Sequence, residues 1–198
     1  MGNMTTIGLI RHGVTAWNKE GRAQGSSDIP LDAEGIAMAE RVAARLAGEQ
    51  WDVIYSSPLS RAKMTAEIIG NEMPGVPMVL DDRIRETGGG KIEGTTEAER
   101  IEKWGANWRE LDMGFEPHDE VISRGMACIS DIQDNYPGKR VLLVSHGSFI
   151  KRLLNELVPN TDLDQGVDNT SVTILTLQDE GNHCSLYNCT AHLKAVDA

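Results

Sequence analysis

The stretch "IGLIRHGVTAWN", residues 7–18, joins a continuous apolar run to an arginine, a histidine and a glycine. Two other short apolar runs, "DVIYS" (52–56) and "RVLLVS" (140–145), are likewise continuous instead of alternating with polar residues. Runs of this kind are typical of strands that are buried on both faces of a parallel sheet. The sequence therefore predicts a parallel sheet that contains these three strands.

Helical patterns separate the predicted strands. Asp32 is a suitable N-cap for one helix, which ends near Gly48. Ser57 and Pro58 predict the cap and first turn of a second helix, which ends at Gly70. The inner face of the first helix is expected to consist of Ile36, Ala39, Ala43 and Leu46. Three more helices are predicted, one opened by the capping box of Thr96 and Glu99, one over 118–135 and one beginning after position 146.

The tail of the chain predicts an antiparallel hairpin. Two strand-like segments, "SVTILTLQ" (171–178) and "CSLYNC" (184–189), are joined by the turn-forming "DEGNH". Together with the alternation of strands and helices, this predicts an α/β fold, a three-layer sandwich with a mostly parallel central sheet, helices on both faces and a C-terminal hairpin. Because the chain contains no repeat or linker, we expect a single domain over residues 1–198.

Composition excludes several classes of partner. The net charge of -11 disfavours nucleic-acid binding, which normally needs a basic surface. No apolar run approaches the roughly 18 residues of a membrane span. The three cysteines form no even disulfide framework and no signal peptide precedes them, so we expect a cytoplasmic protein. The oligomeric state is left open by the sequence.

Polar residues gather after the three predicted strands. Arg11 and His12 follow the first, Arg61 follows the second, and His146 follows the third. Ligands of open α/β sheets bind outside the carboxyl ends of the strands, so we expect these four side chains to meet in one pocket.

Each cluster also has a simpler interpretation. A single Arg-His pair at a strand end is more often a partner in surface ion pairs than a catalyst, and the adjacent Ser145 and His146 suggest a serine hydrolase. The serine hydrolase is disfavoured because no G-x-S-x-G motif occurs. No metal site is predicted. Packing or surface roles are expected for several other residues: an apolar stripe of Ile101, Trp104, Trp108 and Leu111 on one helix, and His118, His183 and His192.

Five motifs in order resemble the histidine phosphatase superfamily, in its phosphoglycerate mutase-like branch: "LIRHGVTAWN", "GSSDIPLDAEG", "IYSSPLSRAKMTA", "RETGGGKIEGTT" and "VLLVSHG". The resemblance spans nearly the whole chain. It implies a phosphohistidine intermediate on His12, with Glu86 as proton donor. It also implies a phosphate pocket formed by Arg11, Arg61 and His146. Further substrate contacts are implied for Asn18, Gln24 and Gly25.

The residue types suit phosphoryl transfer, in which catalysis is mainly positioning and charge stabilisation. Arg11 and Arg61 offer planar, permanent charges that match phosphate oxygens. A protonated His146 is expected to add positive charge, and the backbone N–H groups of Gly147 and Ser148 open a helix, which is a suitable anion site. Because these groups supply the charge, we expect no metal or other cofactor.

Departures from the family pattern bear on the substrate. Val14 stands where many members have glutamate, and Ile92 where many have a bulky aromatic residue. The stretch from Glu86 to His146 covers the pocket in the family and is shorter here than in the glycolytic mutases. A short cover favours hydrolysis, and its 87–120 segment is expected to read the leaving group. We therefore expect a metal-independent phosphatase that acts on a small phosphorylated substrate. The alternatives are a cofactor-dependent phosphoglycerate mutase and a catalytically dead phosphoprotein-binding module.

Overall fold

The computed structural model describes residues 4–159, 161–163 and 165–194, which contain one six-stranded sheet. The strands are β1 (Thr5–Arg11), β2 (Val53–Ser56), β3 (Met78–Leu80), β4 (Arg140–Ser145), β5 (Val172–Leu177) and β6 (His183–Cys189), in the order β3-β2-β4-β1-β5-β6. The first four are parallel, whereas β5 is antiparallel to both β1 and β6. The three predicted strands and the hairpin are confirmed. The sequence analysis missed β3, whose Met78 and Leu80 are exposed.

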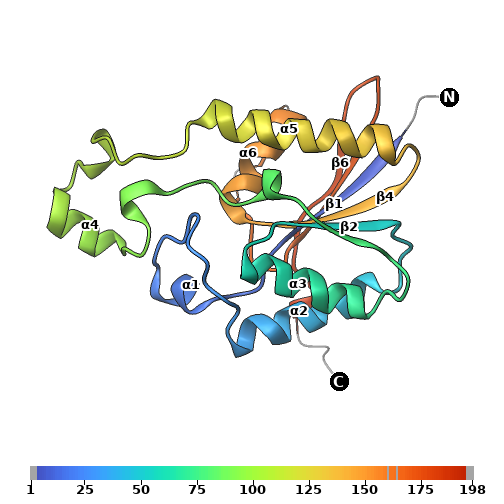
Figure 1. Ribbon diagram of the computed structural model, residues 1–198, viewed down its shortest axis with the longest axis horizontal. Helices are drawn as coiled ribbons and strands as arrows, with labels where there is room; N and C mark the ends of the chain where they lie inside the picture. Colours follow the sequence, from blue (N-terminus) through green and yellow to red (C-terminus); the bar gives the residue numbers. More distant parts are fainter. Residues whose placement is uncertain (1–3, 160, 164, 195–198) are drawn as a thin grey trace.

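Helices cover both faces of this sheet, which confirms the three-layer sandwich. The helices are α1 (Ala16–Glu20), α2 (Ala33–Leu46), α3 (Ser60–Asn71), α4 (Glu97–Trp104), α5 (His118–Asn135) and α6 (Gly147–Leu157). In Figure 1, α5 and α6 lie above the sheet and α2 and α3 lie below it. Each pair buries its apolar side chains against one face, so the core consists of two clusters with the sheet between them.

The first two predicted helices need correction. Asp32 does cap α2, because its Oδ1 accepts the N–H of Gly35 at 2.8 Å. Ile36, however, is exposed, and Val42 is buried in the inner face instead. The second helix, α3, begins at Ser60 and not after Ser57, because the backbone is still extended at the intervening Leu59.

The predicted stripe of Ile101, Trp104, Trp108 and Leu111 is wrong. Helix α4 does begin with the Thr96 capping box, but it ends at Trp104, where Gly105 adopts a φ of 87°. Trp108 lies in a separate short 3-10 turn and is buried, with the Arg100 guanidinium 5.3 Å from its ring centroid. Ile101 and Leu111 are exposed to solvent.

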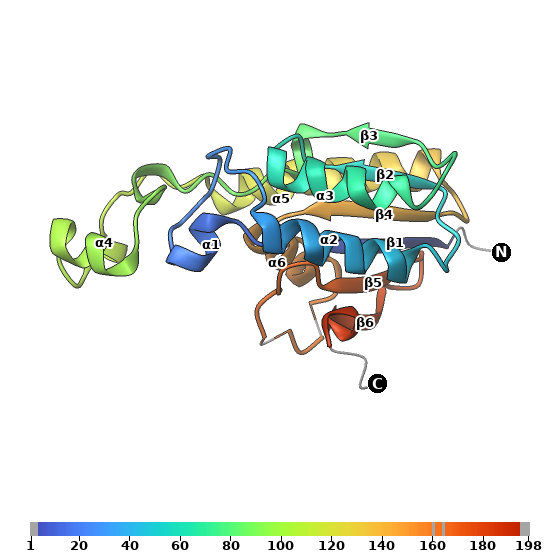
Figure 2. The ribbon, with the colours of Figure 1, turned by 90° about the horizontal axis from the view of Figure 1, so that it is seen from below.

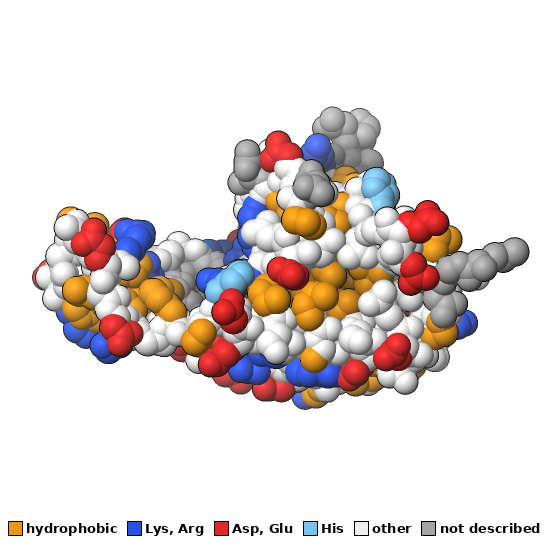
Figure 3. Space-filling model, turned by 90° about the horizontal axis from the view of Figure 1, so that it is seen from above, with side chains coloured by type: hydrophobic (Ala, Val, Ile, Leu, Met, Phe, Trp, Pro, Cys, Tyr) orange, Lys and Arg blue, Asp and Glu red, His pale blue; other side chains and the backbone are white. Residues whose placement is uncertain are grey.

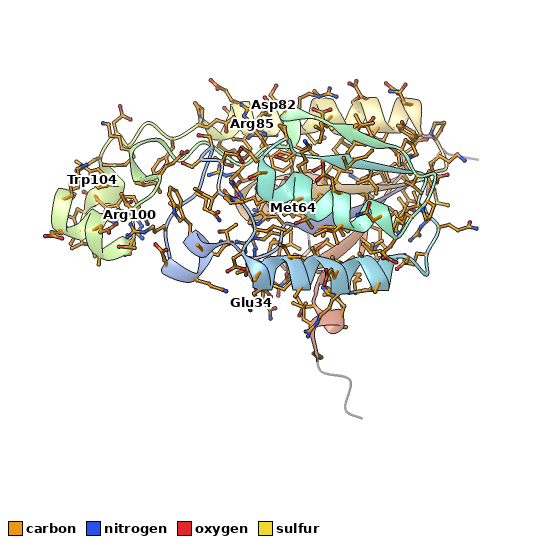
Figure 4. The ribbon with its side chains drawn as sticks, turned by 60° about the horizontal axis from the view of Figure 1, so that its bottom comes forward. Glu34, Met64, Asp82, Arg85, Arg100 and Trp104 are labelled. Carbon is orange, nitrogen blue, oxygen red and sulfur yellow. The ribbon has the colours of Figure 1, made fainter. Side chains whose placement is uncertain are left out.

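Residues 88–116 form an arm that projects from the body of the protein, with α4 near its tip (Figure 2). The space-filling view shows the arm as a lobe beside the main body (Figure 3). Arg100 and Trp104 lie on this arm, well away from Met64 on α3 (Figure 4). The segment expected to cover the pocket therefore extends outward over much of its length.

A narrow neck joins the arm to the body. The N–H of Lys91 donates to the carbonyl of Met113 at 2.8 Å, and the N–H of Glu116 donates to the carbonyl of Gly88 at 3.0 Å. Gly90 lies between these pairs with a φ of 54°, and a Cβ there would lie only 2.1 Å from the Met113 oxygen. The neck therefore requires glycine at position 90.

The arm also contacts the loop that follows α1. The Arg22 guanidinium lies 2.7 Å from the Glu99 carboxylate, and the N–H of Gly94 donates to the carbonyl of Ala23. None of the helices in the described residues is both long and apolar enough to cross a membrane.

Candidate active site

The carboxyl ends of β1, β2 and β4 bring the predicted strand-end residues to one place. Strand pairing sets Arg11 beside Ser145, and the N–H of His12 continues the ladder by donating to the Ser145 carbonyl at 3.0 Å. The N–H of Ser57 donates to the Val144 carbonyl in the same way. The turns after the three strands therefore start at the same edge of the sheet.

His12 is buried and held in one tautomer. Its Nδ1 lies 2.6 Å from the carbonyl oxygen of Gly13, which can only accept a hydrogen bond, so Nδ1 carries the proton. Burial, together with the charges of Arg11 and Arg61, lowers the pKa of His12 well below its usual value. The ring is therefore neutral at physiological pH, with a free electron pair on Nε2.

Glycine is required beside this histidine. A Cβ on Gly13 would lie 2.4 Å from the backbone oxygen of Gly35 at the start of α2. The N–H of Gly13 donates to the Thr65 hydroxyl on α3. This close packing of the turn against two helices fixes the carbonyl that orients His12.

Arg61 is buried and Arg11 is half-buried, and the hydrogen bonds that their guanidinium groups make with the described residues go to backbone carbonyls. Arg61 donates to the carbonyls of Ser27 and Gly25 at 2.6 and 2.8 Å, and Arg11 donates to that of Val167 at 2.6 Å. The Nε atom of each has no partner among the described residues. Burial lowers the pKa of Arg61 to about 10, so it remains charged at pH 7. Among the described residues neither guanidinium has a carboxylate within ion-pair distance, and enclosed cations of this kind indicate a site for an anion.

His146 differs from the expected imidazolium. Burial, with the nearby His12, Arg61 and Arg11, lowers its pKa well below the usual value, so the ring is neutral in the absence of a bound anion. The ring centroids of the two histidines are 5.2 Å apart. The positive charge of the pocket therefore comes from the two arginines.

Ser57 determines which nitrogen of His146 carries the proton. The Ser57 hydroxyl accepts the N–H of Leu59 at 3.3 Å and lies 2.7 Å from Nε2 of His146. No other acceptor for the Ser57 hydroxyl proton is found among the described residues, so we assign the hydroxyl as the donor to Nε2 and the proton of the neutral ring to Nδ1. Nδ1 has no partner among the described residues. Ser57 was predicted only as a helix cap; its position directly after a buried strand was the signal for a role in the site.

Glu86 uses the backbone donors at the start of α6. Its Oε1 accepts the N–H groups of Thr87 and Phe149 at 2.7 and 2.9 Å, and its Oε2 accepts that of Ser148 at 3.2 Å. The Ser148 N–H, which was expected to bind an anion, therefore donates to Glu86 in this structure. Gly147 has a steric role, because a Cβ there would lie 3.1 Å from Nε of Arg11.

Of the other predicted contact residues, Gln24 and Gly25 line a cavity beside Glu86. The Asn18 side chain instead accepts the N–H of Thr15, the N-cap of α1, in a capping box. The sequence analysis missed Asn169, which donates to the His12 carbonyl at 3.0 Å and lies 3.4 Å from Oδ1 of Asn18.

Two cavities meet at Glu86 and Ser148. One, of about 400 Å³, is lined by Arg11, Glu86, Gly147, Ser148, Lys151, Gly166 and Val167. The other, of about 270 Å³, is lined by Ala23, Gln24, Gly25, Glu86, Thr87, Gly88, Gly89, Ile92, Phe115, Ser148 and Arg152. Of the described residues of the arm, those at its base line the second cavity, and those of α4 near its tip do not. In the described ranges, no cluster of three or more His, Cys, Asp or Glu side chains could hold a metal ion.

Comparison with known proteins agrees with this geometry. The chain is 35% identical to the "Uncharacterized phosphatase PhoE" of Bacillus subtilis, over 96% of this chain and 97% of the relative. It is 36% identical to the "Probable phosphoglycerate mutase GpmB" of Escherichia coli O1:K1 / APEC, over 78% and 75%. The solved structure of Bacillus stearothermophilus YhfR superposes with a TM-score of 0.84 and 32% identity, covering 96% of this chain and all of that one. Residues 7–190 match the model of the histidine phosphatase superfamily (branch 1), so the chain belongs to this superfamily.

Proposed function

We propose that this phosphoric monoester hydrolase cleaves its substrates through a phosphohistidine on His12, without a metal ion. The observation that carries the proposal is the neutral, tautomer-fixed His12 beside two arginines, Arg11 and Arg61, whose Nε atoms have no partner among the described residues. A nucleophile and the charge that an incoming phosphate needs are thus built into one pocket.

In the first step, Nε2 of His12 attacks phosphorus while the bond to the leaving-group oxygen breaks. Arg11 and Arg61 stabilise the charge on the phosphoryl oxygens, and the Nδ1–H of His146 donates to one of them. This donor is present in neutral His146, so the step needs no imidazolium at that position.

Glu86 supplies the proton that the departing oxygen needs. Oε1 is engaged by two backbone N–H groups, whereas Oε2 has one longer contact at 3.2 Å. Oε2 is therefore the oxygen suited to carry the proton. In the second step, a water molecule gives its proton to Glu86 and attacks phosphorus, the bond to His12 breaks, and inorganic phosphate leaves.

Labelling tests the nucleophile. Mixing with radiolabelled p-nitrophenyl phosphate, followed by rapid denaturation, should give an acid-labile, base-stable label on His12. The His12→Gln variant should take up no label, and the exposed His183→Gln serves as the matched control. Label on a serine, or an undiminished turnover in His12→Gln, refutes the mechanism. Binding of phosphate without label would identify a binding module.

The mutase alternative deserves its own assay because one similar protein is named as a probable phosphoglycerate mutase. We expect net release of phosphate, with no isomerisation of 3-phosphoglycerate after priming with 2,3-bisphosphoglycerate. We also propose a cytoplasmic location, because three free cysteines are typical of a reducing compartment.

A further inference from the structure

The cavity of about 270 Å³ lies next to the proposed acid. Glu86, which is proposed to protonate the leaving group, forms part of its wall. On the arm side, the wall is apolar, with Ile92 and the half-exposed Phe115. On the side of α6, the cavity is lined by a cation, Arg152.

Arg152 has no acidic partner among the described residues. Its Nη1 lies 2.7 Å from Nδ1 of His118, and its Nε lies 3.4 Å from the Ser148 hydroxyl. Nearby Arg85 and Arg124, by contrast, both pair with Glu116. No carboxylate lies within ion-pair distance of Arg152 anywhere in the part of the chain that the structure describes. A guanidinium has five N–H donors, so these two contacts leave others for a ligand.

Ser148 links Arg152 to the proposed acid. The Ser148 backbone N–H donates to Oε2 of Glu86, and its side-chain hydroxyl accepts from Nε of Arg152. Glu86 therefore contacts the backbone of Ser148 and Arg152 contacts its side chain, so that Glu86 and Arg152 are only one residue apart in space. A leaving group whose oxygen is at Glu86 reaches Arg152 with a chain of only a few carbon atoms.

We propose that Arg152 binds an anionic group, a carboxylate or a second phosphate, on the leaving group of a small substrate. The inference rests on the proposed phosphatase function and adds a substrate class to it. In a protein with a net charge of -11, long-range attraction does not favour such substrates, so a local cation has to select them. Arg152 is suited to this because its planar, multiply donating group matches an oxyanion.

Matched substrate pairs test the proposal. O-phosphoserine and O-phosphoethanolamine differ only in the carboxylate, and 1,3-propanediol bisphosphate and propyl phosphate differ only in the second phosphate and its ester oxygen. The ratio of kcat/KM within each pair measures the contribution of the added anion. We expect a preference of about tenfold to a hundredfold for the anionic member of one pair, in line with charge-assisted hydrogen bonds. The pair that shows it identifies the anion.

Two variants assign the preference to a residue. Arg152→Gln should reduce the ratio to about one. Lys151→Gln is the matched control, because Lys151 is the adjacent cation on α6 but lines the other cavity; it should keep the wild-type ratio.

Three results overturn the inference: equal kcat/KM within both pairs, a ratio that Arg152→Gln leaves unchanged, or a ratio that Lys151→Gln abolishes instead. Wild-type activity on p-nitrophenyl phosphate tests the proposed function separately. If this activity is present and none of the four substrates is cleaved, the substrate class is wrong while the phosphatase function stands. If it is absent, the function itself fails.

Discussion

Replacing Ser57 with alanine tests how the site controls His146. The hydroxyl lies 2.7 Å from Nε2 in a fully buried setting, so the variant leaves a ring nitrogen buried without its partner. Loss of one partner of a buried hydrogen bond costs about 1–3 kcal/mol. The orientation of the His146 ring directs its Nδ1–H toward the phosphoryl group that is being transferred. Because Ser57→Ala disturbs this orientation, we expect the rate of His12 phosphorylation to fall by about 5- to 150-fold.

Single-turnover phosphorylation of His12 by p-nitrophenyl phosphate is the appropriate assay, since it isolates the first step. Ser57→Thr retains the hydroxyl and should recover most of the rate, which a purely structural effect of the alanine would not predict. Nitrogen-15 NMR of the wild-type protein should show a protonated Nδ1 and an unprotonated Nε2 for His146. An Nε2–H tautomer, or wild-type phosphorylation by Ser57→Ala, refutes the reasoning.

Three further predictions follow from the site. Glu86→Gln should slow single-turnover phosphorylation of His12 by about 10²- to 10⁴-fold with an alkyl phosphate and only slightly with p-nitrophenyl phosphate, whose leaving group is a stable anion; equal losses would remove the acid role. Activity should survive exhaustive chelation by EDTA because arginines supply the charge, and a loss that divalent metal restores would contradict this. Because the pKa values of His12 and His146 are lowered in the folded state, protons bind the unfolded state more tightly. The free energy of unfolding should therefore fall as the pH drops below about 6.5, by about 1.4 kcal/mol per pH unit for each histidine. Urea titrations at a series of pH values should show that the free energy of unfolding depends less steeply on pH in His146→Gln than in the wild type. An equally steep dependence in the variant would rule out this linkage.

Features that depend on local sequence were predictable. The continuous apolar strands, the Asp32 cap and the capping box of Thr96 each involve residues close together in the chain, and the structure has all three. The strand-end clusters were also predictable, because parallel strands place their carboxyl ends at one edge of the sheet.

Features that depend on long-range contacts were not predictable. Ser57 has the sequence pattern of a helix cap, but its hydroxyl contacts His146, which is 89 residues away. The N–H of Ser148 belongs to a helix N-terminus that looks open to an anion, yet Glu86 reaches it from a distant loop. The charge state of His146 depends on how deeply the fold buries the ring beside two arginines, which composition and spacing do not reveal.

The neck at Gly88–Lys91 and Met113–Glu116 has a consequence for how this protein can diversify. Its backbone hydrogen bonds close the arm at the base, so the chain beyond the neck can change in length without moving the sheet or His12. Doubling the length of such a closed segment costs only about 0.6 kcal/mol in loop entropy. Since Ile92 and Phe115 line the cavity beside Glu86 that is proposed to hold the leaving group, new insertions next to the neck are expected to alter the accepted substrate while the phosphate chemistry stays intact. The neck therefore separates a segment whose length can vary from the sheet that positions His12.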